Sequence, residues 1–190
     1  MTARRGPQGA VAHVAHGARS AASLNLYTPG MPSTSNEWFT QPTEHGDGTG
    51  LRFSCTLCGN CCSGPEGYVL VSDDEAAALA RRFGMPVDDF LARYTHMTSE
   101  GRSLTEKIVE LPGRGKVHDC IFLDRETVPG KAVCGVYEDR PAQCRTWPFW
   151  PSVVRSRQTW QWAKRICPGI DKGQFYTVQQ VRIIRDSFNI

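Results

Sequence analysis

The chain has 190 residues, 40% of them hydrophobic, which fits one globular domain with or without a tail and excludes a large two-domain enzyme. Its 22 Lys and Arg residues exceed its 19 Asp and Glu residues by only three, which excludes a general basic footprint for nucleic acid. Eight cysteines are too few for a small disulfide scaffold and too many to be incidental.

Residues 1–50 differ in composition from the rest of the chain. They contain five Val, Ile, Leu or Phe residues and eleven Gly or Pro residues, whereas residues 51–190 contain 34 of the former. We therefore expect a flexible low-complexity tail over 1–50 and a folded domain over 51–190. The start lacks the continuous apolar stretch of a secretory signal, and no run approaches the ~18 apolar residues of a membrane span. These features predict a cytoplasmic protein without a membrane partner.

Local signals predict several short helices. Ser72 and Glu75 fit the two ends of a capping box, and good helix formers follow, so we expect a helix over about 73–83. Pro86 begins a second short helix, which would complete a helical hairpin. Thr177 fits the cap of a final helix with one apolar face.

Short apolar or alternating runs predict strands over 107–111, 117–123 and 132–137. A Pro-Gly turn at 129–130 would join the last two, so Cys120 and Cys134 are expected on paired strands. Trp160 and Trp162 alternate with other residues in a further predicted strand. Together these elements predict a small irregular α+β domain of short helices and a few short antiparallel strands.

The cysteines are the strongest chemical signal in the sequence. Four lie within eight residues, and the other four are spread over the second half of the chain. In a reducing cytosol, closely spaced thiols more often bind metal or do redox chemistry than form disulfides. The candidate metal ligands, which would also staple the domain, are Cys55, Cys58, Cys61, Cys62, Cys120, Cys134, Cys144 and Cys167.

The spacing leaves the metal open. A CxxC turn followed by Gly59 suits tetrahedral zinc, because the tight turn directs both sulfurs to one ion. Cys55, Cys58 and Cys61 also form CxxCxxC, which can hold three corners of a 4Fe-4S cluster while a distant cysteine holds the fourth. Cys62 directly follows Cys61, which implies a polynuclear centre, two sites or one thiol that is not a ligand.

Other interpretations of the cysteines carry less weight. One is a set of four disulfides in an exported protein, and another is a group of buried free thiols. A third is a CxxC dithiol oxidoreductase, which would need a helix at the motif, and Gly59 disfavours a helix there. His118 could replace one cysteine as a ligand, although a histidine satisfied within a strand is the favoured reading.

The order of these motifs resembles that of a known family. Phe53-x-Cys55-x-x-Cys58-Gly59-x-Cys61-Cys62, the block Arg140-Pro141-x-x-Cys144-Arg145 and a late Cys167-x-Gly169 are similar to the YkgJ-type CxxCxxCC cysteine-cluster proteins. The resemblance covers about residues 53–170. It implies a zinc- or iron-chelating domain whose eight cysteines form the site, sometimes labelled an iron-sulfur oxidoreductase. Trp147 stands where the family commonly has phenylalanine.

Four further residues are expected to support the cofactor. Cys144 would lie near the start of a short helix that begins at Pro141. There the helix dipole and the guanidinium groups of Arg140 and Arg145 would favour a thiolate. Trp147 and Phe149 are placed either to exclude water from the metal or to serve as ordinary core residues.

The favoured function is the binding of zinc or iron. The bound metal would serve a structural, metal-handling or electron-transfer role, and the protein would act with a redox or protein partner. The alternative is a metal-dependent or iron-sulfur oxidoreductase, although the sequence offers no acid–base pair for an enzyme on its own. A second alternative is an interaction module for RNA or an acidic partner, since residues 140–190 carry nine Lys or Arg residues against two Asp. We favour the interpretation that these positive charges offset the negative charge of metal-bound thiolates. Nucleic acid is therefore not an expected partner.

Overall fold

The computed structural model describes residues 37–42, 46 and 48–188. By its internal contacts the chain divides into residues 1–33 and 34–190, and every described residue belongs to the second unit. Most of the expected tail, residues 1–36, therefore lies outside the described residues.

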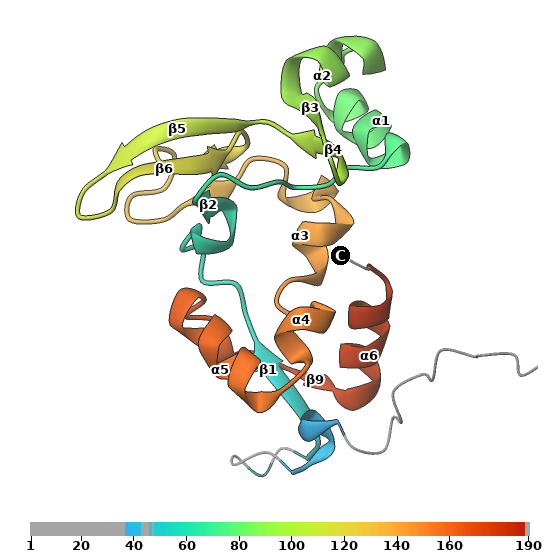
Figure 1. Cartoon of the computed structure of the whole chain (residues 1–190), viewed down its shortest axis with the longest axis vertical. Helices are drawn as coiled ribbons and strands as arrows, with labels where there is room; N and C mark the ends of the chain where they lie inside the picture. The colour runs from blue at the N-terminus through green and yellow to red at the C-terminus, as the bar shows by residue number, and fades with distance from the viewer. Residues whose placement is uncertain (1–36, 43–45, 47, 189–190) are drawn as a thin grey trace, which may run out of the picture. The chain divides into compact units, whose positions relative to one another are not determined.

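The described unit consists of short helices and short strands (Figure 1). The helices are α1 (Asp73–Arg82), α2 (Val87–Tyr94), α3 (Ala142–Thr146), α4 (Pro151–Val154), α5 (Arg157–Ile166) and α6 (Val178–Asp186). The strands are β1 (Gly50–Phe53), β2 (Ser63–Gly64), β3 (Thr95–Thr98), β4 (Gly101–Leu104), β5 (Glu106–Leu111), β6 (Gly115–Cys120), β7 (Leu123–Asp124), β8 (Val133–Cys134) and β9 (Ile170–Thr177). The pairs β1–β9, β2–β6, β3–β4, β5–β6 and β7–β8 are all antiparallel, so the small α+β fold is confirmed.

The predicted helix starts are confirmed. Ser72 accepts a hydrogen bond from the Glu75 backbone N–H at 3.3 Å, and the Glu75 carboxylate accepts one from the Ser72 backbone N–H at 3.0 Å. This capping box begins α1, and α2 completes the hairpin. Thr177 caps α6 in the same way, with Gln180 as its partner.

Two strand predictions are wrong. The run 117–123 breaks at a turn after Cys120, so Cys120 ends β6 opposite Glu106, whereas Cys134 in β8 lies opposite Leu123 of β7. Cys120 and Cys134 are thus in different sheets. Trp160 and Trp162 lie in helix α5, because a second capping box at Ser156 starts a helix there. Trp160 is buried in the core, and Trp162 faces outward.

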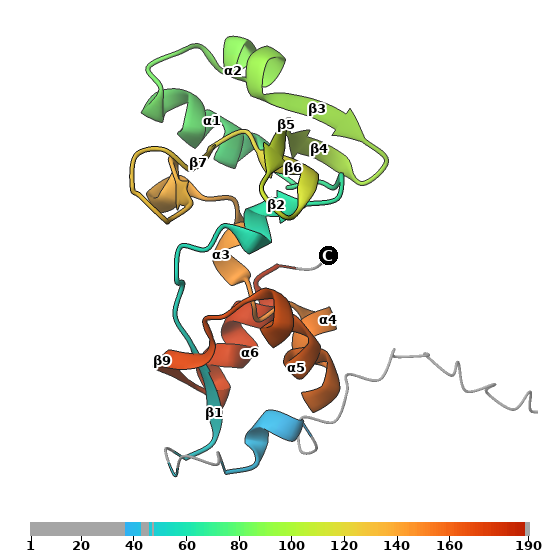
Figure 2. The ribbon, with the colours of Figure 1, turned by 90° about the vertical axis from the view of Figure 1, so that its left-hand side faces the viewer.

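The buried residues form two hydrophobic clusters. The first, which we call the C-terminal core, lies among β1, β9 and α4–α6, and includes Leu51, Phe149, Val154, Trp160, Ile170 and Val181. The second, the hairpin core, lies beneath α1 and α2, and includes Val71, Leu79, Phe90, Leu104 and Val136. Figure 2 shows helix α3 and the β2 segment running between the elements that carry the two cores.

The folded unit begins before residue 51. Phe39, in a one-turn 3₁₀ helix over Trp38–Thr40, is buried in the C-terminal core, and the Trp38 indole N–H donates to the Val154 carbonyl at 2.8 Å. Glu37 forms ion pairs with Arg182 and Arg185 of α6. The expected tail over 1–50 therefore does not extend to residues 37–42, whose two adjacent aromatics supply enough apolar surface to pack.

Phe39→Ala tests this boundary. Loss of a fully buried phenylalanine should lower the free energy of unfolding by about 3 to 5 kcal/mol, measured by denaturant titration. Ile183→Ala is the control, because Ile183 on α6 is exposed and its truncation should change stability by less than about 0.5 kcal/mol. Equal stability of the two variants would place residues 37–42 outside the folded unit.

Candidate metal centre

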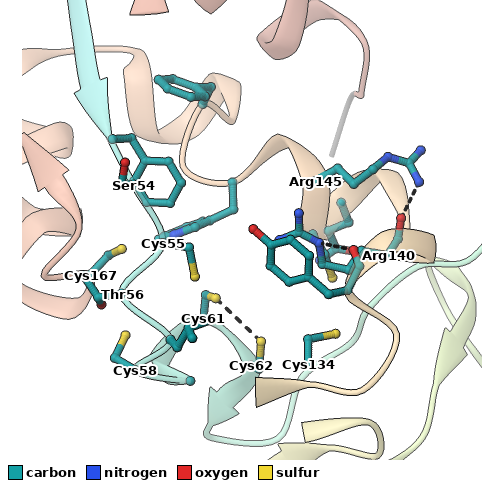
Figure 3. Close-up of a pocket in the computed structure, with 18 of the residues that line it drawn as sticks. Ser54, Cys55, Thr56, Cys58, Cys61, Cys62, Cys134, Arg140, Arg145 and Cys167 are labelled. Carbon is teal, nitrogen blue, oxygen red and sulfur yellow. Dashed lines mark hydrogen bonds between the residues drawn. The ribbon is translucent and has the colours of Figure 1, made fainter. Parts of the chain in front are cut away.

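Most of the cysteines surround one cavity of about 370 Å³ (Figure 3). The seven that line it are Cys55, Cys58, Cys61, Cys62, Cys134, Cys144 and Cys167, and all eight cysteines of the chain are free thiols. Cys120, at the end of β6, is the one that does not line the cavity. Among the described lining residues there is no His, Asp or Glu, so the available metal ligands are sulfurs.

The loop between β1 and β2 carries four of these thiols in a tightly turned backbone. Leu57 and Gly59 both have positive φ, of 56° and 72°, and Asn60–Cys62 form one turn of 3₁₀ helix. A Cβ atom on Gly59 would lie 2.5 Å from the Ala132 Cβ, and the Ala132 backbone N–H donates to the Leu57 carbonyl at 2.8 Å. The loop is thus held directly against the hairpin that carries Cys134.

The same loop is tied to the segment of Cys167 on its other side. The Ser54 backbone N–H donates to the Gly169 carbonyl at 3.2 Å, and the Asn60 side chain donates to the Ile166 carbonyl at 2.8 Å. A Cβ atom on Gly169 would collide with the Ser54 carbonyl oxygen. Ser54 and Asn60 were not singled out from the sequence, since a single polar residue beside a CxxC motif has no distinctive signal.

Burial and neighbouring thiols set the electrostatics of the site. Burial raises the pKa of Cys120 to about 11 and also raises the pKa values of Cys134, Cys144 and Cys167. The Cys61 and Cys62 sulfurs lie 3.6 Å apart. The hydrogen bond between them lowers the pKa of Cys61 to about 7 and raises that of Cys62.

The thiolate expected at Cys144 from its helix is not favoured in the metal-free protein. Helix α3 has only five residues, and Cys144 is its third. Burial and the neighbouring thiols raise the pKa of Cys144 more than Arg140 lowers it. A short helix has few aligned peptide dipoles, so burial dominates.

The two arginines at the cavity are fixed by the protein itself. The Arg140 guanidinium lies 3.6 Å from the Tyr137 ring centroid and donates to the Tyr137 carbonyl at 2.8 Å. Arg145 donates to the Arg140 carbonyl and lies 3.5 Å from the Glu75 carboxylate. Arg140 also lowers the pKa values of Cys61, Cys134 and Cys144, so its charge reaches cysteines from three different segments.

Aromatic side chains form one wall of the cavity. Phe149 is both a lining residue and part of the C-terminal core, with its ring centroid 4.7 Å from that of Tyr176. The Trp147 indole nitrogen is buried without a hydrogen-bond partner. Burial raises the pKa of the Cys167 thiol, which is a neighbour of this indole. An unpaired indole N–H beside a thiol fits a site in which that sulfur becomes a thiolate acceptor.

The thiols do not yet converge on one point. Within the described residues, no three His, Cys, Asp or Glu side chains are arranged to hold a metal ion as they stand. The sulfurs surround the cavity, so metal binding requires cysteine side chains to turn toward shared positions. His118 lies outside the cavity on β6, with its Nδ1 atom 3.3 Å from the Glu106 carboxylate.

The fold and the thiol-lined cavity together indicate a cysteine-cluster metal-binding protein. The sequence model of the CxxCxxCC family, described as "Putative zinc- or iron-chelating domain", matches residues 54–168. This span is more than half of the chain, so the chain belongs to the CxxCxxCC family. No solved structure matches the chain. None of the helices in the described part of the chain combines the length and the apolar character needed to cross a bilayer.

Gly59→Ala tests how the CxxC loop is positioned. The added methyl group meets Ala132, so the variant should lose about 1 to 3 kcal/mol of stability beyond the strain of its positive φ, and should bind less metal. The control is Gly113→Ala, because Gly113 has a φ of 73° and open space around its Cβ position. Equal loss in both variants, measured by denaturant titration and bound metal per chain, would show that contact with Ala132 is unimportant.

Proposed function

We propose that this chain binds zinc or iron through thiolates of the cavity and that the bound metal links its two cores. The observation that carries the proposal is the cavity lining, with seven cysteines and no imidazole or carboxylate. All-sulfur ligand sets suit tetrahedral zinc and iron-sulfur clusters, whereas magnesium and calcium prefer oxygen.

The chain's own residues are suited to stabilise such a centre. A bound metal ion lowers the pKa of a coordinating thiol, so binding releases the protons that burial keeps on the metal-free cysteines. The resulting thiolates gain a positive neighbour in Arg140, and Phe149 with Trp147 limits the access of water from one side. The metal itself supplies the cross-link between segments that are distant in sequence.

A structural or metal-handling role is favoured over catalysis. The lining offers no carboxylate or histidine among its described residues to act as a general acid or base. Cys55 and Cys61 are exposed, which gives a metal a direct route into the cavity. An electron-transfer or oxidoreductase role is the second candidate, because exposed sulfurs beside an aromatic wall would also allow electrons to reach an iron-sulfur cluster.

Binding of RNA or an acidic partner receives less support. Arg182 and Arg185 form ion pairs with Glu37, and Lys164 pairs with Asp171 at 2.9 Å. Arg140 and Arg145 line the cavity. Much of the positive charge between residues 140 and 190 is therefore used inside the protein.

Metal analysis of the full chain purified without oxygen tests the proposal. We expect zinc or iron bound in stoichiometric amounts. Acid-labile sulfide and a brown colour would identify an iron-sulfur cluster, and a colourless zinc protein would identify a structural or metal-handling site.

Removal of the metal should also lower the melting temperature. Structural zinc contributes about 10 to 16 kcal/mol in small peptides, and loss of only about 3 kcal/mol would lower the melting temperature of a domain of this size by roughly 10 °C. Ile183→Ala is the control, because Ile183 is exposed on α6, and it should melt and bind metal like the parent. An unchanged melting curve after verified metal removal would contradict the structural role.

A further inference from the structure

Three of the cysteines outside the β1–β2 loop divide between the two cores. Cys167 is a buried member of the C-terminal core, whereas Cys120 and Cys134 pack against the hairpin core. The loop with the other closely spaced thiols meets both sides, through Ser54 at Gly169 and Gly59 at Ala132. Ligands are therefore available on two sides of one shared segment.

The neighbours of each thiol follow the same division. Cys62 and Cys144 both have Cys120 as a thiol neighbour, Cys144 also has Cys134, and Cys61 acts on both of them. Cys167 instead has Cys58 and Cys61 as its thiol neighbours. Figure 3 shows Cys55, Cys58 and Cys167 on one side of Cys61, with Cys62 and Cys134 on the other.

Ligand number points the same way. A tetrahedral zinc ion or a four-iron cluster takes four cysteines, so a single centre would leave half of the eight thiols unused. Cys61 has thiol neighbours on both sides, with Cys167 on one and Cys62, Cys134 and Cys144 on the other. We assign it to the side of Cys167, because Cys62, Cys120, Cys134 and Cys144 already supply four ligands on the other side. Their sulfurs are 3.6 Å apart, so centres on the two sides would be close neighbours.

We propose that the eight cysteines form two adjacent four-thiolate metal sites, which rests on the proposed metal-binding function. The first site uses Cys55, Cys58, Cys61 and Cys167, and the second uses Cys62, Cys120, Cys134 and Cys144. Each site attaches one core to the shared loop, so the loop carries ligands for both metals. The charge of Arg140 acts on Cys134 and Cys144 of the second group and also on Cys61 of the first.

Counting metals in the intact chain provides the first test. The reduced full chain, titrated with zinc(II) and measured by native mass spectrometry, should bind two zinc ions. One zinc ion per chain would overturn the two-site inference while leaving the proposed metal-binding function intact. No bound zinc, together with no iron in the protein as purified, would overturn the proposed function itself.

Single substitutions provide the second test. Cys167→Ser and Cys144→Ser should each lower zinc from two ions to one, and the double variant should bind none. Ile183→Ala, at an exposed position on α6, should keep both. In each single variant, alkylation followed by peptide mass spectrometry should label the three remaining thiols of the affected group and spare the other four. Loss of all zinc in both folded single variants, with labelling spread over both groups, would show one shared centre. The count on the parent chain needs no variant, so a substitution that prevents folding does not remove the test.

Discussion

Close backbone approach at the loop between β1 and β2 is the constraint on which the rest of the site depends. The loop must contact the hairpin of Cys134 and the segment of Cys167 at once. Gly59 allows the first contact because it has no Cβ atom to meet Ala132, and Gly169 allows the second because it leaves room for the Ser54 carbonyl. Two separate cores are thereby brought to opposite sides of one short run of cysteines.

Burial favours the neutral thiol form of the cavity cysteines, whereas metal binding requires the thiolate form. The cavity can satisfy the first requirement without metal and the second with metal. Without metal, burial keeps protons on thiols such as Cys120 and Cys144, which then behave as small apolar side chains. In the proposed metal-bound state, the thiolate charge would be offset by the ion and by Arg140. The Trp147 indole N–H would then have a thiolate acceptor in Cys167. The proposed role of the metal is therefore to join preformed parts of the fold.

The helix starts and the clustering of thiols were predictable from sequence because their signals are local. The capping boxes at Ser72 and Thr177 and the CxxC spacing are determined by residues a few positions apart. The failures involve longer-range effects. A turn after Cys120 divides an apparently continuous strand, and the alternation at Trp160 is compatible with a helix once Ser156 caps it. The partners of Gly59 and Gly169 depend on tertiary contacts that no spacing rule describes.

X-ray absorption spectroscopy on the metal-loaded full chain tests the central claim of an all-thiolate centre most directly. It reports the atoms bound to the metal and their distances without any substitution. We predict a first coordination shell of sulfur alone, at about 2.3 Å for zinc. A first shell dominated by nitrogen or oxygen at about 2.0 to 2.1 Å would contradict the account, because the described lining of the cavity offers no histidine or carboxylate to supply it.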